Sequence, residues 1–276
     1  MYGVVYMEKR QVFPFSSILI LVILSLILWL LCYLSGFLPK PIETRVADIP
    51  VDAEQNGMLL TPTDDLGDEY IQKMIFLGES TTYGLWHYGV LPDGKQTDQV
   101  WTGATVQNGN ICCAGTLSLS PSLTSTRIFY PDTCEALTIS EALARKKPEY
   151  LVITLGLNNG ASYYTEDNFK QCYRKLLNSV ISSSGDTVIL LQSIFPVAKS
   201  CQIKAYTPER IQLCNSWIYD LALEYGVRYL DTASALADED GYLKAEYDNG
   251  GDGIHLNREG LTAVLGYIRT HGVEQS

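Results

Sequence analysis

Three short polar segments of this sequence contain side chains that together could carry out acyl transfer. They contain Ser80, Asn158, and the pair Asp252 and His255. A serine hydroxyl becomes a nucleophile when an imidazole takes its proton, a carboxylate orients that imidazole, and N–H donors stabilise the oxyanion. Each residue also has an ordinary interpretation, because serine caps helices, asparagine stabilises turns and Asp-x-x-His occurs by chance. The combination predicts a hydrolase site if folding brings the segments together.

The elements around these segments predict how they could meet. Continuous apolar runs predict strands, and runs with a helical period predict helices. The expected strands are residues 73–77, 150–155, 187–191 and 227–230, and the expected helices are residues 138–147, 165–183, 208–225 and 257–270. Apolar strands that alternate with helices indicate a parallel sheet covered on both faces. Ligands of such sheets bind at the carboxyl ends of the strands, where Ser80 and Asn158 are expected.

The same segments resemble sequence blocks of the SGNH, or GDSL-like, hydrolase family. Phe76–Thr81 resembles block one, with Glu79 in place of the usual aspartate. Gly156–Asn159 resembles block three, with asparagine replacing the final aspartate, and Asp252–His255 resembles block five. The resemblance extends over roughly residues 73–270 and implies an α/β fold with three layers, built on a flavodoxin-like doubly wound parallel sheet.

The resemblance implies a role for each catalytic candidate. Ser80 would attack an ester carbonyl, His255 would take the proton of the serine, and Asp252 would hold the imidazole. The family implies no metal and no cofactor. The sequence lacks the Gly-x-Ser-x-Gly elbow of ordinary α/β-hydrolases, because Thr82 stands where the second glycine would be.

An oxyanion hole is also implied by the resemblance. Its donors would be the backbone N–H of Ser80, the side-chain amide of Asn158 and the N–H of a block-two glycine. Gly103, Gly109 and Gly115 all lie between the first two long strands. Gly103 lies nearest the expected position, and Gly115 is the alternative.

An uncharged run from Gln11 to Pro39 predicts a membrane segment. Roughly 20 helical residues cross a hydrocarbon core of about 30 Å. The length of the run and the lack of a small-x-small cleavage site favour an uncleaved signal-anchor over a signal peptide. The expected parts are a short tail at residues 1–13, a transmembrane helix at residues 14–38, a tether at residues 39–68 and a hydrolase domain at residues 69–276. The flanking basic residues are balanced, and the short N-terminus favours an extracytoplasmic domain.

The charge of the chain excludes one large class of partners. The formal net charge is -11 and the sequence pI is about 4.7. A general nucleic-acid binder needs a basic surface that displaces counterions from phosphates. We therefore expect no nucleic-acid partner.

Neither the cysteines nor an acidic loop predicts a metal site. Seven cysteines occur without a Cys-x-x-Cys pair, which disfavours a zinc ribbon. In an extracellular domain Cys201 could pair with Cys214, and Cys134 with either cysteine at positions 112 and 113. Residues 248–259 match four positions of an EF-hand loop, but Gly250 offers no side chain at the third position.

The expected function is that of a membrane-anchored serine esterase that removes acetyl or other short acyl groups from envelope or other glycans. Aromatic residues near the serine, Tyr83, Trp86, Tyr88 and Trp101, would suit sugar or acyl groups, or would simply pack a loop. An acyltransferase with the same serine chemistry is an alternative. The departures from the family blocks also leave open an inactive module that binds a glycan or a protein.

Overall fold

The computed structural model describes residues 57–273. The predicted transmembrane helix at residues 14–38 lies outside the described residues. Between residues 57 and 273, no helix is both long and apolar enough to cross a bilayer.

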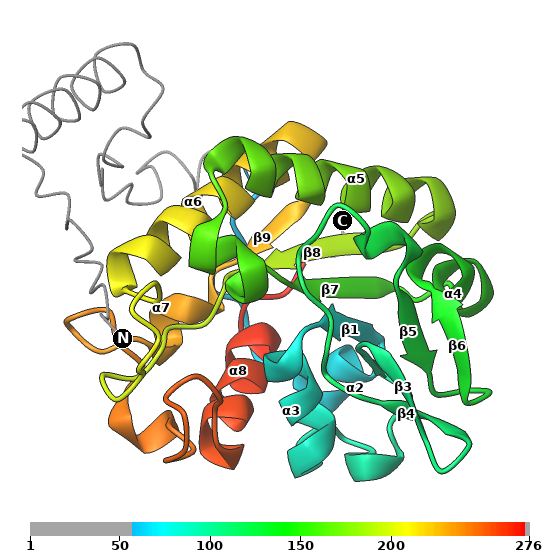
Figure 1. The fold of residues 1–276 in the computed structure, drawn as a ribbon, viewed down its shortest axis with the longest axis horizontal. Coiled ribbons are helices and arrows are strands. Elements are labelled where there is room, and N and C mark those ends of the chain that lie inside the picture. Colours follow the sequence, from blue (N-terminus) through cyan, green and yellow to red (C-terminus); the bar gives the residue numbers. More distant parts are fainter. Residues whose placement is uncertain (1–56, 274–276) are drawn as a thin grey trace, which may run out of the picture. The chain divides into compact units, whose positions relative to one another are not determined.

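A five-stranded parallel sheet forms the centre of the domain (Figure 1). Its strands are β1 (Met74–Gly78), β2 (Val100–Trp101), β7 (Tyr150–Thr154), β8 (Val188–Gln192) and β9 (Arg228–Leu230). The order across the sheet is β2-β1-β7-β8-β9, and every pair is parallel. This is the flavodoxin-like order, in which the chain changes direction across the sheet beside β1. The predicted parallel α/β sheet is therefore confirmed.

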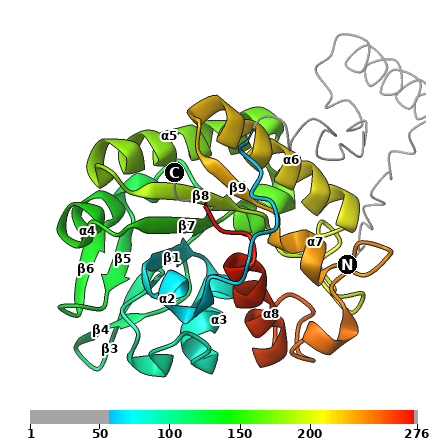
Figure 2. The same cartoon turned by 180° about the vertical axis from the view of Figure 1, so that it is seen from behind.

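Helices cover both faces of the sheet (Figures 1 and 2). The helices are α2 (Gly67–Gln72), α3 (Ser80–Tyr88), α4 (Ile139–Lys146), α5 (Glu166–Ser184), α6 (Pro208–Tyr225), α7 (Thr232–Leu236) and α8 (Arg258–Arg269). One apolar cluster joins the sheet to α4, α5 and α6, and a second joins it to α2, α3 and α8. The domain thus has the three layers that the resemblance implies.

The central strands lack a polar face because both of their faces are covered. In β1, Ile75 and Leu77 belong to the cluster beneath α4, α5 and α6. Met74 and Phe76 alternate with them and belong to the other cluster. All four are at most 2% exposed. Alternate side chains of a strand point to opposite faces, so a strand covered on both sides reads as a continuous apolar run.

Local capping chemistry sets the ends of the helices that the sequence predicts. Thr138 and Glu141 form a capping box at the start of α4. The Thr207 hydroxyl caps α6, which opens with Pro208 and ends at Gly226 in the left-handed conformation. The observed bounds of these helices therefore lie close to the predicted ones.

Two antiparallel hairpins and several short turns lie outside the sequence prediction. One hairpin joins β3 (Ala104–Gln107) to β4 (Asn110–Cys113), and the other joins β5 (Arg127–Tyr130) to β6 (Glu135–Thr138). The short helical turns are η1 (Gly94–Gln96), η2 (Leu123–Ser125), a π-type turn η3 (Leu157–Ala161) and η4 (Ala245–Tyr247). Both hairpins lie between β2 and α4, where the sequence analysis places no element.

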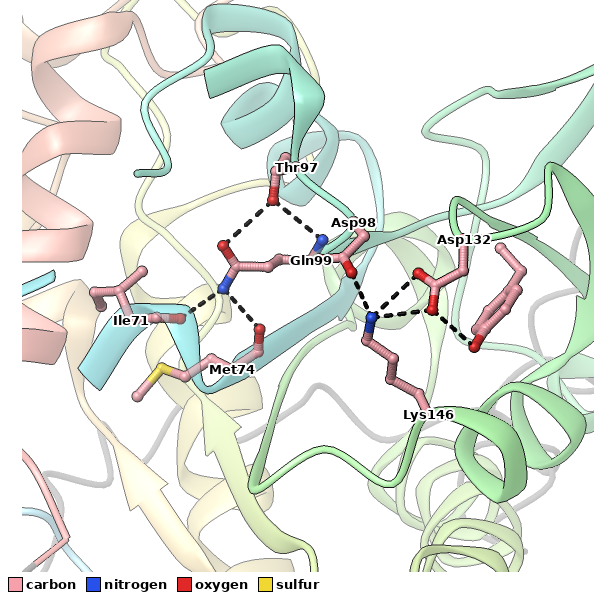
Figure 3. Close-up of polar contacts among 8 residues, drawn as sticks. Ile71, Met74, Thr97, Asp98, Gln99, Asp132 and Lys146 are labelled. Carbon is pink, nitrogen blue, oxygen red and sulfur yellow. Dashed lines mark hydrogen bonds and ion pairs between the residues drawn. The ribbon is translucent and has the colours of Figure 1, made fainter. Parts of the chain in front are cut away.

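The buried Gln99 fixes the start of β2 against the neighbouring elements (Figure 3). Its amide donates to the carbonyls of Ile71, at 2.6 Å, and Met74, at 2.9 Å. Thr97 donates to the amide oxygen of Gln99 and accepts from its backbone N–H. The side chain thereby satisfies carbonyls at the end of α2 and the start of β1. A two-residue edge strand is held in register by this network as well as by its own ladder.

Part of the predicted tether pairs with the far edge of the sheet. The Leu60 N–H donates to the Tyr229 carbonyl at 2.9 Å, and the Tyr229 N–H donates to the Met58 carbonyl at 2.8 Å. The Leu60 side chain is 6% exposed and belongs to the apolar cluster beneath α2, α3 and α8. Residues 58–60 thus contribute to the core although the sequence places them before the domain.

Candidate active site

The structure brings the three predicted catalytic side chains into one hydrogen-bonded chain. The Ser80 Oγ lies 2.8 Å from the Nε2 of His255. The Nδ1 of His255 lies 2.7 Å from the Oδ2 of Asp252. Ser80 begins α3, one residue after β1 ends, whereas the other two residues lie in the loop before α8. A hydroxyl, an imidazole and a carboxylate in this order can move a proton from the serine to the histidine.

Backbone contacts hold Asp252 in place for His255. The Oδ1 of Asp252 accepts from the N–H groups of Ile254, at 2.9 Å, and His255, at 3.1 Å. Burial raises the pKa of Asp252, but these two bonds and the imidazole outweigh burial and keep it below its usual value. The side chain is therefore an ionised acceptor for the ring N–H of the histidine at neutral pH.

Gly253 allows the turn that carries this pair. Its φ of +72° lies in the left-handed region, and a Cβ there would stand 2.6 Å from the backbone nitrogen of Cys201. The Gly253 carbonyl accepts from the Ala198 N–H at 2.8 Å. Only glycine allows both the conformation and the close approach of the two loops. The loop after β8 therefore supports the turn between Asp252 and His255.

Glu79 connects the serine to the segment that carries Asn158. Its side chain is 2% exposed, and it accepts from the N–H groups of Gly156 at 3.1 Å, Leu157 at 2.8 Å and Asn158 at 2.9 Å. Burial raises the pKa of Glu79 to about 8, and the three N–H bonds act in the opposite direction. The residue that replaces the block-one aspartate thus joins the ends of β1 and β7.

The predicted oxyanion donors have different surroundings in the structure. The Asn158 amide donates to the Leu117 carbonyl at 3.4 Å. A Cβ built at Gly103 would meet Thr116 and Leu117, whereas one built at Gly115 would meet Tyr83 and, at 3.4 Å, the Cα of Ser80. The alternative glycine, Gly115, is therefore the one beside the serine.

The N–H of Gly115 is already engaged in this structure. It donates to the hydroxyl of the buried Thr102 at 3.1 Å, and the same hydroxyl lies 2.9 Å from the Cys113 sulfur. Gly115 would have to release this bond to donate to an oxyanion, so the Ser80 N–H and the Asn158 amide remain the candidate donors that the sequence predicts. Thr102 is a residue that the sequence analysis missed, since its role depends on a contact across the β3–β4 hairpin.

A cleft of about 230 Å³ opens beside the serine. It is lined by Ser80, Thr81, Tyr83, Gly84, His87, Tyr88, Asn249, His255 and Leu256. The rings of Tyr83 and His87 are 5.9 Å apart, and the rings of His87 and Tyr88 are 5.0 Å apart. Sequence reasoning found the tyrosines but not His87 or Asn249. The signal for His87 is its position seven residues, or two helical turns, after Ser80 on the same face of α3.

The cysteines and acidic residues add no second site among residues 57–273. Cys201 and Cys214 are free thiols, as are the cysteines at positions 112, 113 and 134, so the disulfides considered from the sequence are not formed. Burial raises the pKa of Cys214 to about 12. In this part of the chain no group of three or more histidine, cysteine or acidic side chains has the geometry to hold a metal.

Fold and site together define a class of flavodoxin-like α/β proteins with a serine after the first strand and an Asp-x-x-His before the last helix. The family comparison agrees, because the model of the GDSL-like lipase/acylhydrolase family matches residues 76–263. The chain belongs to this family, whose members are acyl hydrolases or esterases.

Solved structures with similar folds were also found, whereas no curated protein matches. A protein described as a putative platelet activating factor from Streptococcus pneumonia is 20% identical, with 71% of this chain and 81% of that chain covered and a TM-score of 0.49. A putative acylhydrolase from Bacteroides fragilis is 16% identical, with 82% and 94% covered and a TM-score of 0.49. The periplasmic domain of a Salmonella Paratyphi A lipopolysaccharide acetyltransferase is 15% identical, with 79% and 87% covered and a TM-score of 0.45. These TM-scores lie below 0.5, so the assignment depends on the family match.

Proposed function

We propose that this protein is a serine esterase of SGNH type. His255 Nε2 takes the proton of Ser80 as the serine oxygen attacks the ester carbonyl, and Asp252 accepts the ring N–H on the other side of the imidazole. The alcohol leaves with the proton from His255, and water then hydrolyses the acyl-enzyme with His255 again as base. The observation that carries the proposal is the 2.8 Å contact between Ser80 Oγ and His255 Nε2, continued at 2.7 Å to Asp252.

The proposed substrates are glycans that carry acetyl or other short acyl esters. The cleft beside the serine has a volume of about 230 Å³, which is below the roughly 300–1,000 Å³ of common ligand pockets. An acetyl group fits in this space, and a cleft of this size offers little surface to a long acyl chain. The aromatic side chains of Tyr83, His87 and Tyr88 line the same cleft and offer flat faces to a sugar ring.

The deciding experiment measures both covalent labelling of the serine and hydrolysis of an ester substrate. Wild-type protein should react with a fluorophosphonate and hydrolyse p-nitrophenyl acetate, and Ser80→Ala should do neither. Ser182→Ala is the matched control, because this exposed serine lies on α5 and its hydroxyl bonds to the Ser179 carbonyl of the same helix. Wild-type turnover in Ser80→Ala would refute the mechanism, and an unlabelled wild-type protein would favour an inactive binding module.

Acyl preference tests the proposed substrate class. The ratio of kcat/KM for p-nitrophenyl acetate to that for p-nitrophenyl octanoate should exceed about tenfold, since the small cleft contacts little of a longer chain. Acetate release from an acetylated oligosaccharide should accompany this preference. Equal rates for both esters, or no acetate from the oligosaccharide, would contradict the short-acyl glycan assignment.

We also propose that residues 14–38 anchor the protein in a membrane with the hydrolase domain on the extracytoplasmic side. The support is the uncharged run between Gln11 and Pro39. Membranes from expressing cells should retain the full-length protein after alkaline carbonate washing, and added protease should digest the domain in intact spheroplasts. Release by carbonate would contradict the anchor, and protection from protease would contradict the orientation.

A further inference from the structure

The segment that carries Asn158 is held at both ends by side chains from outside it. At its start, the Glu79 carboxyl accepts from three successive N–H groups, as described above. At its end, the guanidinium of Arg210 on α6 donates from Nη2 to the Gly160 carbonyl at 3.0 Å and from Nε to the Ala161 carbonyl at 3.0 Å. A further bond from Nη2 reaches the Tyr164 carbonyl.

The segment needs such external partners because its backbone is irregular. Asn158 has an extended ψ of 126°, and Asn159 has a φ of 66° in the left-handed region. Neither residue can therefore continue a regular helical hydrogen-bond ladder. The Ala161 N–H donates to the Gly156 carbonyl at 2.7 Å, and the Tyr164 N–H donates to the Gly160 carbonyl at 3.2 Å. Without Glu79 and Arg210, several polar groups of this turn would lose their partners inside the domain.

Arg210 is itself fixed in position. It lies in the first turn of α6, where its N–H bonds to the capping hydroxyl of Thr207. Its guanidinium lies over the ring of Trp217, 5.0 Å from the ring centroid. In the described part of the chain no carboxylate forms an ion pair with Arg210. Its Nε and Nη2 donate to backbone carbonyls, whereas its buried Nη1 has no hydrogen-bond partner there. A rigid, planar guanidinium suits this task because it presents several donors in fixed directions.

We propose that Arg210 is a positioning residue for the esterase reaction, which acts by holding the Asn158 amide where the oxyanion forms. This inference rests on the proposed function. Glu79 holds the turn at the side of Ser80, and Arg210 holds it from α6, so the backbone that carries the Asn158 amide is held from both sides. A small displacement of a catalytic group by about 1 Å can cost up to roughly 100-fold in rate.

A double-mutant cycle with Asn158 tests the proposal on the full-length protein. Arg210→Met should lower kcat for p-nitrophenyl acetate by about tenfold with little change in KM, and Asn158→Ala should lower it by about 100-fold or more. The double variant should have the kcat of Asn158→Ala within about twofold, because Arg210 acts through the amide that is already absent. Arg174→Met is the matched control and should leave kcat unchanged, since this exposed arginine of α5 forms an ion pair with Glu224 on α6.

The possible outcomes separate the two proposals. If the effects of Arg210→Met and Asn158→Ala multiply while Ser80→Ala is inactive, the esterase assignment stands and the positioning role is wrong. If Ser80→Ala retains turnover, the esterase assignment itself fails. If Arg210→Met does not fold, the cycle is measured with Arg210→Lys, which keeps a cationic donor. A loss of kcat in Arg210→Lys that disappears in the Asn158→Ala background supports the role, and a loss that persists there, or no loss at all, overturns it.

Discussion

The replacement Glu79→Gln tests how the buried carboxyl next to Ser80 couples the stability of the domain to pH. Burial raises the pKa of Glu79 from 4.5 to about 8, whereas in the unfolded chain the side chain is hydrated and keeps its ordinary value. Between these two pH values the native state therefore binds a proton that the unfolded state does not. Since the folded pKa is the higher one, the stabilisation is complete below the unfolded pKa and is lost as the pH rises through the folded pKa.

The size of the effect follows from the two pKa values. One pKa unit corresponds to about 1.4 kcal/mol, so the change from 4.5 to about 8 corresponds to roughly 5 kcal/mol. The free energy of unfolding of the wild-type protein should fall by up to about this amount between pH 4.5 and 8. Glutamine does not ionise, so Glu79→Gln should lack this fall. The variant should be less stable than the wild type at pH 5, because its amide NH2 faces backbone N–H groups that have lost an acceptor.

Urea unfolding of the full-length protein in detergent, followed by tryptophan fluorescence from pH 5 to 8, measures the effect. The stability of the wild type relative to Glu79→Gln should fall steadily as the pH rises, and the variant should become the more stable of the two at the upper end of this range. Glu224→Gln is the matched control, because Arg174 lowers the pKa of this exposed glutamate and confines its titration to acid pH. A difference between wild type and Glu79→Gln that stays constant across this range would refute the reasoning, since it would mean that the three N–H bonds keep the carboxylate ionised.

Three further substitutions test other parts of the site and the fold. Asp252→Asn should lower kcat for p-nitrophenyl acetate by roughly 10³–10⁴-fold, because asparagine does not stabilise the imidazolium; a loss under tenfold would contradict its role. Gly115→Ala introduces a Cβ at a residue with φ +61°, and this Cβ would stand 3.0 Å from the Tyr83 side chain, so kcat/KM should fall about tenfold or more. Gly109→Ala is the control, because Gly109 also has a positive φ, +81°, but its Cβ would meet nothing within 4 Å, and kcat/KM should be unchanged. Gln99→Leu removes the side-chain donor of two buried carbonyls and should lower the free energy of unfolding by about 1–3 kcal/mol in urea titrations with kcat unchanged. Equal stability would contradict the network in Figure 3.

The strands and the flanking helices could be predicted because local sequence determines them. Residues 150–154 form a strand that is buried on both faces, which gives a continuous apolar run. Pro208 and Gly226 mark the two ends of α6 through backbone chemistry that involves only neighbouring residues. Ser80 and Asn158 could be placed at one edge because parallel strands end on the same side of a sheet.

The region between β2 and α4 could not be predicted in the same way. Its strands β3, β4, β5 and β6 have four residues each and are partly exposed, so they show neither an apolar run nor a clear alternation. One local signal was present, because the Asn108-Gly109 pair at positive φ is a common hairpin turn. Gly103 was favoured over Gly115 from its place along the chain, but the β3–β4 hairpin brings the later glycine back to Ser80. Arg210 gave no signal, since its carbonyl partners lie 46–50 residues away.

The two departures from the family blocks are explained by contacts outside the hydrogen-bonded chain of Ser80, His255 and Asp252. Asn159 adopts a φ of 66°, a conformation that asparagine tolerates well, and its amide donates to the Leu119 carbonyl at 3.2 Å, which an ionised aspartate could not do. Glu79 has one more methylene than aspartate, and its two oxygens reach three N–H groups at the end of β7. Both replacements thus stabilise the segment that carries the Asn158 amide, so neither is an argument for an inactive module.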